Sequence, residues 1–270
     1  MPNHTPKPST ARTTEPRTRS TSVGARTVPT RRRSDVVPTP QADHLPRSFF
    51  ACPAQHLAPK LLGHRLVRVL NDGTRLAGVI VETEAYLGAP DMACHTFAGR
   101  RTPRNEAMYG PPGTAYVYFT YGMHHCMNIV CGTRREGVAV LLRAIEPLEG
   151  HDQMKRHRRL TFARRPADLC GGPAKLCQAL AIDLSWNGAD LVEGESLFLE
   201  SGSPVSPRRR CRTTRVGIDG RGEWTGKPLR WYVKDSPYVS VRGRPPTRAT
   251  ESIRGTVPPS STTKRVIKKR

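Results

Sequence analysis

The sequence predicts an α+β fold: a single compact domain with a mostly antiparallel, curved β-sheet and flanking helices. Two observations predict this class. Segments with strand character follow one another in hairpin pairs, whereas a doubly wound fold would alternate strands with helices. Apolar residues are concentrated in the middle of the 270-residue chain, and a chain of this length can bury a substantial core.

The composition divides the chain into three parts. Residues 1–46 are poor in apolar residues and rich in Pro, Thr and Arg, and residues 242–270 share this composition and end in a basic run. Such segments bury too little apolar surface to offset the entropy lost on ordering, so both tails are predicted to be disordered. Residues 47–241 are predicted to form the folded domain.

The chain is strongly basic, with 44 Lys and Arg residues against 22 Asp and Glu residues and a formal net charge of +22. More than half of the excess charge lies in the two tails. The charge disfavours a simple metabolic enzyme or an acidic partner protein, and it favours a polyanion such as nucleic acid or an anionic membrane surface. A second explanation stays open, in which the charge is solvated surface without a binding role.

The first predicted elements are a short helix at 56–62 and a hairpin. Leu66–Leu70 has the pattern of a strand, Asn71–Thr74 has the composition of a turn, and Leu76–Tyr86 has the pattern of a second strand. Two such runs joined by a turn of this kind predict a β-hairpin.

The middle of the chain predicts three further strands. Ala115–Thr120 is rich in residues that favour strands, and Tyr121 and Gly122 interrupt it before Cys126–Val130 resumes the pattern. Gly137–Glu146 is the third of these strands. Pro147 is predicted to end it, because proline cannot donate to a strand ladder.

The last third of the chain mixes helices with short strands. Pro147–Leu160 is amphipathic and basic, and Pro173–Ala181 places proline in the first helical turn before good helix formers. Short strands are predicted at 196–199, 215–218 and 230–233.

Two carboxylates in the predicted strand 76–86 are the first candidates for catalysis. Glu82 and Glu84 are two residues apart, so both side chains point to the same face of the strand. A carboxylate on a partly buried face suits general-base chemistry. The alternative, favoured for an isolated pair of this kind, is that the carboxylates form ion pairs with arginines at the end of the strand.

Aromatic residues interleaved with arginines predict contacts with nucleic acid. Rings stack on bases and arginines hold phosphates, although a sheet core with arginines on its surface explains the same pattern. The aromatic residues are Tyr86, Phe97, Tyr109, Tyr116, Tyr118, Tyr121 and Trp224, and the arginines are Arg100, Arg101, Arg104 and Arg143.

The seven cysteines form no regular framework, so reduced intracellular thiols are expected in a chain long enough to fold without disulfides. The spacings also lack the short cysteine pairs of structural zinc sites, and no metal and no cofactor is predicted. No apolar run approaches the length of a membrane span, so no membrane partner is expected.

Several longer motifs, in order from about His56 to Val241, resemble the alkyladenine (3-methyladenine) DNA glycosylase family of base-excision-repair enzymes. The tails fall outside the resemblance. The motifs are Val81–Gly88, His95, Thr102–Asn105, Pro112–Tyr118, Tyr121–Met123, Cys126–Asn128, Val140–Ala144, Glu146–Gly150, Gly172–Leu180 and Lys227–Val233.

The resemblance implies a monofunctional DNA glycosylase, a hydrolase that needs neither a metal nor a covalent lysine intermediate. It would remove alkylated and deaminated purines, including 3-methyladenine, 7-methylguanine and hypoxanthine, and leave an abasic site. Glu84 matches the general base that activates water, Arg143 matches an arginine that helps to hold this water, and the backbone carbonyl of Val216 matches a third contact.

The resemblance also implies how the damaged base is bound. Tyr86, His95 and Tyr118 match the residues that sandwich the flipped base. Asn128 matches the residue that disfavours the exocyclic amino group of guanine, and Tyr121 matches the residue that intercalates into the gap left in the base stack.

The sequence departs from the family pattern at the loop 97–101 and at His124 and His125 beside Tyr121. The expected partner is double-stranded DNA containing damaged purines, and the expected protein is a monomer, intracellular and associated with DNA, whether in a cytoplasm with a nucleoid or in a nucleus. Two alternatives are a noncatalytic module that binds damaged DNA and a protein that coats nucleic acid through its tails.

Overall fold

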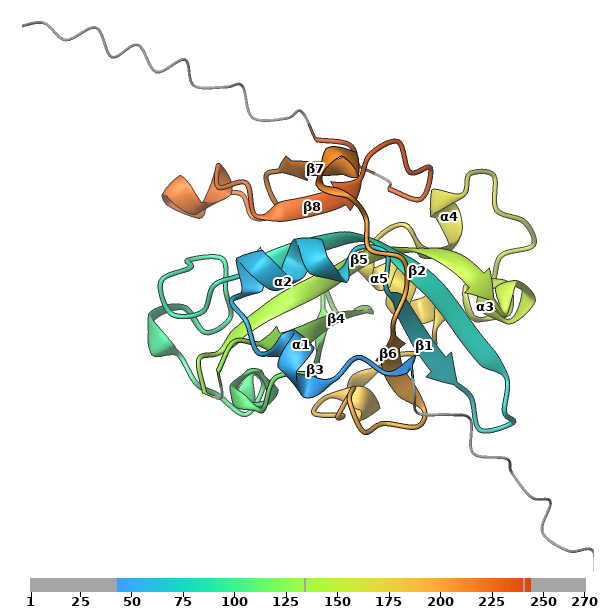
Figure 1. The fold of residues 1–270 in the computed structure, drawn as a ribbon, viewed down its shortest axis with the longest axis horizontal. Coiled ribbons are helices and arrows are strands. Elements are labelled where there is room, and N and C mark those ends of the chain that lie inside the picture. The colour runs from blue at the N-terminus through green and yellow to red at the C-terminus, as the bar shows by residue number, and fades with distance from the viewer. Residues whose placement is uncertain (1–42, 134, 240, 244–270) are drawn as a thin grey trace, which may run out of the picture. The chain divides into compact units, whose positions relative to one another are not determined.

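An eight-stranded sheet organises the computed structural model, which describes residues 43–133, 135–239 and 241–243 (Figure 1). Along the sheet the strands follow the order β3-β4-β5-β2-β1-β6, while β8 pairs with β2 and with β7. The strands are β1 (Arg65–Val69), β2 (Arg75–Tyr86), β3 (Ala115–Thr120), β4 (His124–Cys131), β5 (Val138–Glu149), β6 (Leu197–Glu200), β7 (Arg210–Thr213) and β8 (Arg230–Val233).

The described α-helices are short, and several single 3₁₀ turns join the strands. The α-helices are α1 (Arg47–Phe50), α2 (Ala54–Leu61), α3 (His151–His157), α4 (Ala167–Cys170) and α5 (Pro173–Ala179). The 3₁₀ turns are Phe97–Gly99, Glu106–Tyr109, Leu184–Trp186, Pro207–Arg209 and Gly222–Thr225.

The predicted fold class is confirmed, because each strand pair recorded in the sheet is antiparallel and the described residues belong to one compact unit. The long strands β2 and β5 bend as they cross the molecule (Figure 1). The predicted disorder of 1–46 and 242–270 falls almost wholly outside the described residues and stays a prediction.

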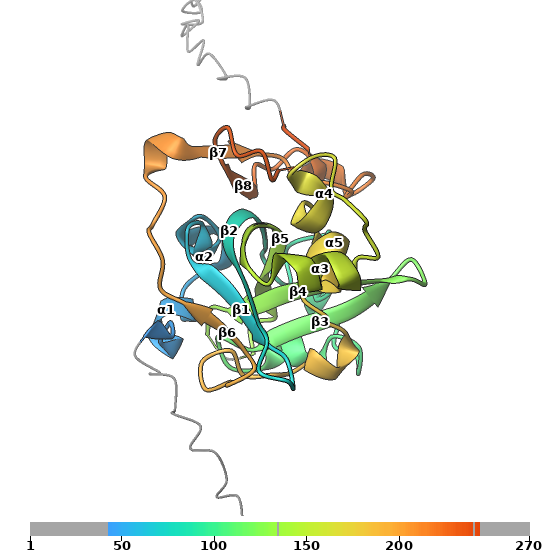
Figure 2. The same ribbon diagram turned by 90° about the vertical axis from the view of Figure 1, so that its right-hand side faces the viewer.

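The first predicted hairpin is present as β1 and β2. In its turn, the Thr74 backbone N–H donates to Asp72 Oδ1 at 2.9 Å, and Gly73 adopts a φ of +83°, a region that glycine enters without steric cost. Strands β3 and β4 form a second hairpin, and the turn between them lies at the right-hand edge of the view in Figure 2.

The two faces of the sheet bury different kinds of side chain. On one face, α2 and α5 cover a large apolar core that includes Leu57, Ile80, Leu142 and Leu176. The alternation of side chains along each strand sends the neighbouring residues to the other face, where a smaller cluster forms around Tyr116. This second face carries the candidate site.

Two predicted boundaries near Pro147 and one predicted strand are wrong. β5 does not stop at Pro147 but continues to Glu149, because Pro147 lies opposite Gly78 beside a register irregularity, where the ladder tolerates a missing donor. The helix predicted from Pro147 therefore begins at His151. Arg215–Ile218 is not a strand, because its polar groups bond to side chains of the candidate site.

Candidate active site

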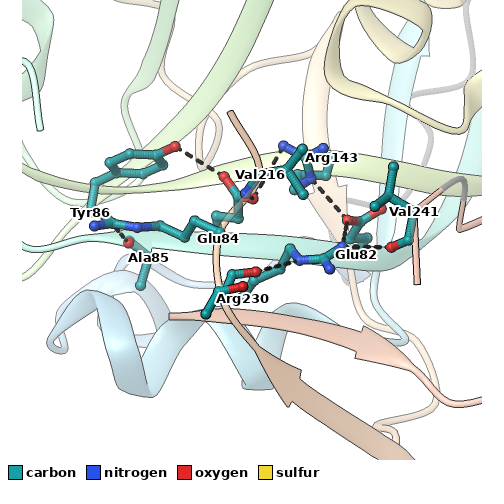
Figure 3. Close-up of polar contacts among 10 residues, drawn as sticks. Glu82, Glu84, Ala85, Tyr86, Arg143, Val216, Arg230 and Val241 are labelled. Atoms are coloured by element: carbon teal, nitrogen blue, oxygen red, sulfur yellow. Dashed lines mark hydrogen bonds and ion pairs between the residues drawn. The ribbon is translucent and has the colours of Figure 1, made fainter. Parts of the chain in front are cut away.

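The two carboxylates singled out in the sequence lie on the same face of β2 and share one arginine (Figure 3). Arg143 on β5 donates from Nε to Glu82 Oε1 at 2.9 Å, and its Nη1 lies 3.2 Å from Glu84 Oε1. Both carboxylates are fully buried, and Arg143 is nearly so. Both carboxylates therefore form the ion pairs with arginine that the alternative explanation expected, but these pairs are buried inside the protein.

A bulge in the sheet brings Arg143 to this position. Glu82 pairs with Ala144 and Thr83 pairs with Leu142, so Arg143 is left between two paired positions of β5. A bulged residue escapes the regular alternation of the strand, and its side chain is redirected. The bulge therefore aims Arg143 at the space between the two carboxylates.

Two further donors fix the Glu84 carboxylate. The backbone N–H of Val216 donates to Oε1 at 2.8 Å, and the Tyr86 hydroxyl donates to Oε2 at 3.0 Å. Burial and the negative charge of Glu84 raise the pKa of Tyr86 well above its ordinary value, so the phenol stays protonated. The Glu84 carboxyl group is thus fixed in position by groups from three separate segments.

A second buried ion pair holds the segment that carries Val216. Arg215 and Asp91 are both fully shielded from solvent, and their two bonds measure 2.6 and 2.9 Å. Arg215 also donates to the Ala85 carbonyl at 2.9 Å and lies over the ring of Tyr86, 4.7 Å from its centroid. Sequence reasoning missed this pair, since 124 residues separate its members and neither belongs to a motif with a known partner.

A cavity of about 480 Å³ opens beside Tyr86 on this face. Aromatic and polar side chains line it together, and its volume lies in the range of small-molecule binding sites. Its lining residues are Tyr86, Met92, Ala93, Cys94, His95, Phe97, Arg100, Thr102, Arg104, Asn105, Met108, Tyr116, Tyr118, Thr120, Tyr121, Asn128, Gly217, Ile218 and Arg221.

Three rings form one wall of the cavity. His95 and Tyr118 meet edge to face with centroids 4.6 Å apart, and Tyr116 stacks on Tyr118 at 5.5 Å. His95 Nδ1 lies 2.7 Å from the Tyr116 hydroxyl. Asn105 holds the loop that carries His95, because its side-chain amide donates to the His95 carbonyl at 2.9 Å.

The surroundings of His95 keep its ring neutral. Partial shielding from bulk water, together with the positive charges of Arg104, Arg100 and Arg221, lowers the pKa of His95 to about 4. The same shielding raises the pKa values of Tyr116 and Tyr118. The wall therefore carries neutral aromatic rings at neutral pH.

Asn128 and Tyr121 both line the cavity but differ in exposure. Asn128 is buried on β4 and donates from its amide to the Tyr116 carbonyl at 3.1 Å. Tyr121 sits in the β3–β4 turn with a φ of +51° and is 83% exposed. A ring this exposed at the tip of a hairpin agrees with the sequence-based expectation that the turn presents it outward.

The predicted site residues therefore form two neighbouring groups. Glu84, Arg143 and Val216 make a buried polar group behind Tyr86, whereas His95, Tyr118, Asn128 and Tyr121 line the cavity together with Tyr86. Of the other aromatic residues noted in the sequence, Trp224 packs in the main apolar core, as the alternative explanation held. His124 and His125 border a different cavity of about 310 Å³ against α5.

Within the described ranges, the structure holds no group of three or more His, Cys, Asp or Glu side chains arranged to bind a metal ion. The seven cysteines are all described, and none forms a disulfide. No helix in the described part of the chain is long and apolar enough to cross a membrane.

Comparison with known proteins gives the same answer as the motifs. The model of the methylpurine-DNA glycosylase family matches residues 48–237. The chain is 49% identical over 224 residues to the DNA-3-methyladenine glycosylase of Mus musculus, covering 79% of this chain and 66% of the relative. The Homo sapiens protein of that name is 46% identical over 245 residues, covering 87% and 81%.

A bacterial relative shows how far the similarity extends without long additions. The putative 3-methyladenine DNA glycosylase of Carboxydothermus hydrogenoformans is 48% identical over 198 residues, covering 73% of this chain and 99% of the relative. The mouse protein is longer, and the match spans just under two thirds of its length. The family expected from the sequence motifs is confirmed: this chain belongs to the methylpurine-DNA glycosylase family.

Proposed function

We propose that this protein is a DNA glycosylase of base-excision repair that removes 3-methyladenine, 7-methylguanine and hypoxanthine from double-stranded DNA. The reaction is hydrolysis of the N-glycosidic bond, and it leaves an abasic site. One observation carries the proposal: a buried carboxylate, Glu84, lies directly behind an aromatic cavity that also presents an exposed ring at its mouth.

The aromatic lining of the cavity supports a mechanism in which the nucleotide leaves the duplex. A base inside the stack cannot reach a pocket in the protein, so the enzyme rotates the nucleotide out and accepts its base between the rings. Tyr121 fills the gap in the stack. Its exposure on a hairpin turn supports this role, because a side chain that inserts between base pairs must project from the protein surface.

Glu84 activates the attacking water. Each carboxylate oxygen has two lone-pair positions, and Oε1 already accepts from Val216 and lies against Arg143, whereas the described structure gives Oε2 one donor, Tyr86. A water therefore donates to Oε2 and loses its proton there as it attacks the anomeric carbon of the sugar. Arg143 and the Val216 carbonyl are the other contacts of this water.

The aromatic wall selects the base. Tyr86, His95 and Tyr118 sandwich it, and a cationic alkylpurine gains about 0.5–2 kcal/mol from each favourable π face. A neutral His95 avoids the repulsion that an imidazolium would exert on such a base. Asn128, buried at the inner end, disfavours the exocyclic amino group of guanine and so protects the normal purine.

The protein acts as a monomer on duplex DNA, in the nucleoid or in the nucleus. The arginines at the cavity mouth, Arg100, Arg104 and Arg221, supply the cationic surface that phosphates need. The alternative, a noncatalytic module that binds damaged DNA, would have no use for Glu84 and Arg143 next to the binding cavity.

Glu84→Gln separates the enzyme from the binding module. Base release is measured in single turnover on duplexes carrying each damaged purine, with alkaline cleavage at abasic sites. Removing a general base costs about 10²- to 10⁴-fold, while the affinity for the damaged duplex stays within about threefold of the wild type. Wild-type turnover in Glu84→Gln would show that Glu84 is not the base. A wild-type protein that binds damaged DNA without releasing bases would establish the binding module instead.

A further inference from the structure

Glu82 is a buried charge that the mechanism above does not use. It does not line the cavity, and its side chain is 1% exposed. Its Oε1 accepts from Arg143 at 2.9 Å and from Arg230 at 2.7 Å, whereas its Oε2 has no hydrogen-bond partner among the described residues. One oxygen of Glu82 thus joins two guanidinium groups, which cannot bond to each other.

Arg230 ties Glu82 to the rest of the site. It is the largest fully buried side chain in the described structure, and it lies on β8, directly opposite Glu84 on β2. Its Nε donates to the Thr214 carbonyl at 2.8 Å and its Nη1 donates to the Val241 carbonyl at 2.8 Å. Since Thr214 is two residues before Val216, the same anchor holds the peptide that contacts Glu84 (Figure 3).

Stability alone gives little reason for such an arrangement. Burying charged groups costs desolvation free energy that their attraction barely offsets, and well-packed apolar residues often replace a buried ion network without loss of stability. What an ion network does supply is orientation, because charged hydrogen bonds are strong and the guanidinium is a rigid planar fork.

The geometry shows which orientation is at stake. Arg143 uses its Nε edge to bond to Glu82, and its Nη1 lies 3.2 Å from Glu84 Oε1. Without Glu82, the fork is free to pair with both oxygens of Glu84. A bidentate pair of that kind would occupy the position on Oε2 that the attacking water needs. The backbone of Arg143 is fixed as well, since its carbonyl accepts from the Gly172 N–H at 2.9 Å.

We propose that Glu82 is a positioning residue for base release: anchored by Arg230, it holds the Nε edge of Arg143 and keeps one oxygen of Glu84 open to water. The inference rests on the proposed glycosylase function. It predicts that the exact place of the Glu82 oxygen matters more than its charge, and that Glu82 acts only through Arg143.

Two variants of Glu82 test this. Glu82→Gln keeps an oxygen acceptor at the position of Oε1 and loses the charge, whereas Glu82→Asp keeps the charge and withdraws the oxygen by one methylene. Single-turnover base release on a hypoxanthine duplex is expected to fall about 10-fold in Glu82→Gln and about 100-fold in Glu82→Asp. The affinity for the same duplex stays within about threefold of the wild type in both variants.

A double-mutant cycle shows whether Glu82 acts through Arg143. In an Arg143→Gln background, Glu82→Asp is expected to lower the rate by less than about threefold further, because the group that it positions is gone. A loss as large as in the wild-type background, or a folded Glu82→Asp variant with the wild-type rate, would overturn the proposal. Glu82→Gln slower than Glu82→Asp would do so too, since charge would then be the deciding property.

Thr83→Val is the matched control for stability. The Thr83 hydroxyl donates to the Ala58 carbonyl at 2.8 Å on the opposite face, so its loss destabilises the same strand without touching the cluster. It should lower the melting temperature and leave the rate intact. If neither Glu82 variant folds, Arg230→Lys replaces them in the same cycle, with the same coupling expected. A wild-type protein that releases no base would instead overturn the proposed function itself.

Discussion

Arginines occupy two opposite environments in this protein, one behind the cavity and one at its mouth. Behind the cavity, Arg143, Arg215 and Arg230 are buried, and each forms an ion pair with a carboxylate. At the mouth, Arg100 and Arg221 are exposed. Buried paired charges fix geometry, whereas exposed charges attract a polyanion in a salt-dependent way. The comparison separates residues that should control rate and stability from residues that should control DNA affinity.

Breaking a buried pair should have the largest effect. Asp91→Asn leaves Arg215 buried with an uncompensated charge, and removing one partner of such a pair costs about 3–5 kcal/mol of the free energy of unfolding. Chemical denaturation followed by circular dichroism measures this. Asp152→Asn, at an exposed pair with Lys155, is the control and should leave stability nearly unchanged. Equal stability of both variants would remove the distinction between the two environments.

Tyr86 tests whether the buried group needs each of its donors. Tyr86→Phe keeps the ring in the cavity wall and removes the hydroxyl that orients Glu84 Oε2. Single-turnover base release is expected to fall about tenfold, which corresponds to roughly 1.4 kcal/mol. Tyr109→Phe removes a hydroxyl that bonds to the Arg100 carbonyl, away from Glu84, and should keep the wild-type rate. An unchanged rate in Tyr86→Phe would mean that Glu84 is oriented without this donor.

Arg221 tests the exposed environment. Arg221→Ala should weaken DNA binding a few-fold and reduce the slope of log affinity against log salt concentration by about 1, as expected for one lost phosphate contact. Fluorescence anisotropy at several salt concentrations measures the slope. Arg208→Ala, at a residue that does not line the cavity, is the comparison. An unchanged slope in Arg221→Ala would place the phosphates elsewhere.

His95 links the two environments, because the exposed arginines lower the pKa of an imidazole ring in the cavity wall. The folded pKa of about 4 lies below the ordinary value of 6.5, so the unfolded chain takes up a proton first as the pH falls. Stability contributed by neutral His95 is present above pH 6.5 and is lost between pH 6.5 and 4.

His95→Gln should therefore make the free energy of unfolding less dependent on pH in that window. The difference stays below about 1.4 kcal/mol per pH unit, since the open cavity weakens the effect through solvent screening. Nuclear magnetic resonance titration of the imidazole provides a direct check. A His95 ring that titrates near pH 6.5 would contradict the neutral wall.

Local patterns predicted most of the sheet. β3 and β8 have the bounds expected from their sequences, and the β1–β2 hairpin differs from the prediction by one residue at its ends. The strand predicted at 215–218 is wrong, because Arg215 and Val216 bond to Asp91 and Glu84 instead of to a neighbouring strand. Strand β7 was missed, because its four residues, Arg210–Thr213, follow a basic run and show no periodic pattern of apolar residues.

The candidate site divides in the same way. Strand parity predicted that Glu82 and Glu84 share a face, and the motif order predicted the family, both of which are confirmed. The functional roles of Glu84, Arg143, Val216, Tyr86, His95, Tyr118, Asn128 and Tyr121 stay predictions. Sequence reasoning gave no sign of Asp91, Arg215 or Arg230 as residues of the site.

By itself, the sequence determined what short-range physics controls: the strand character of β2 and the turn that follows β1. The tertiary structure decided which charges meet. Glu82 pairs with Arg230, 148 residues away in the sequence, and Asp91 pairs with Arg215, 124 residues away. No local sequence pattern encodes such pairs. A buried charge needs a partner of opposite charge, and only the packed sheet, with its bulge at Arg143, decides which side chains are buried together.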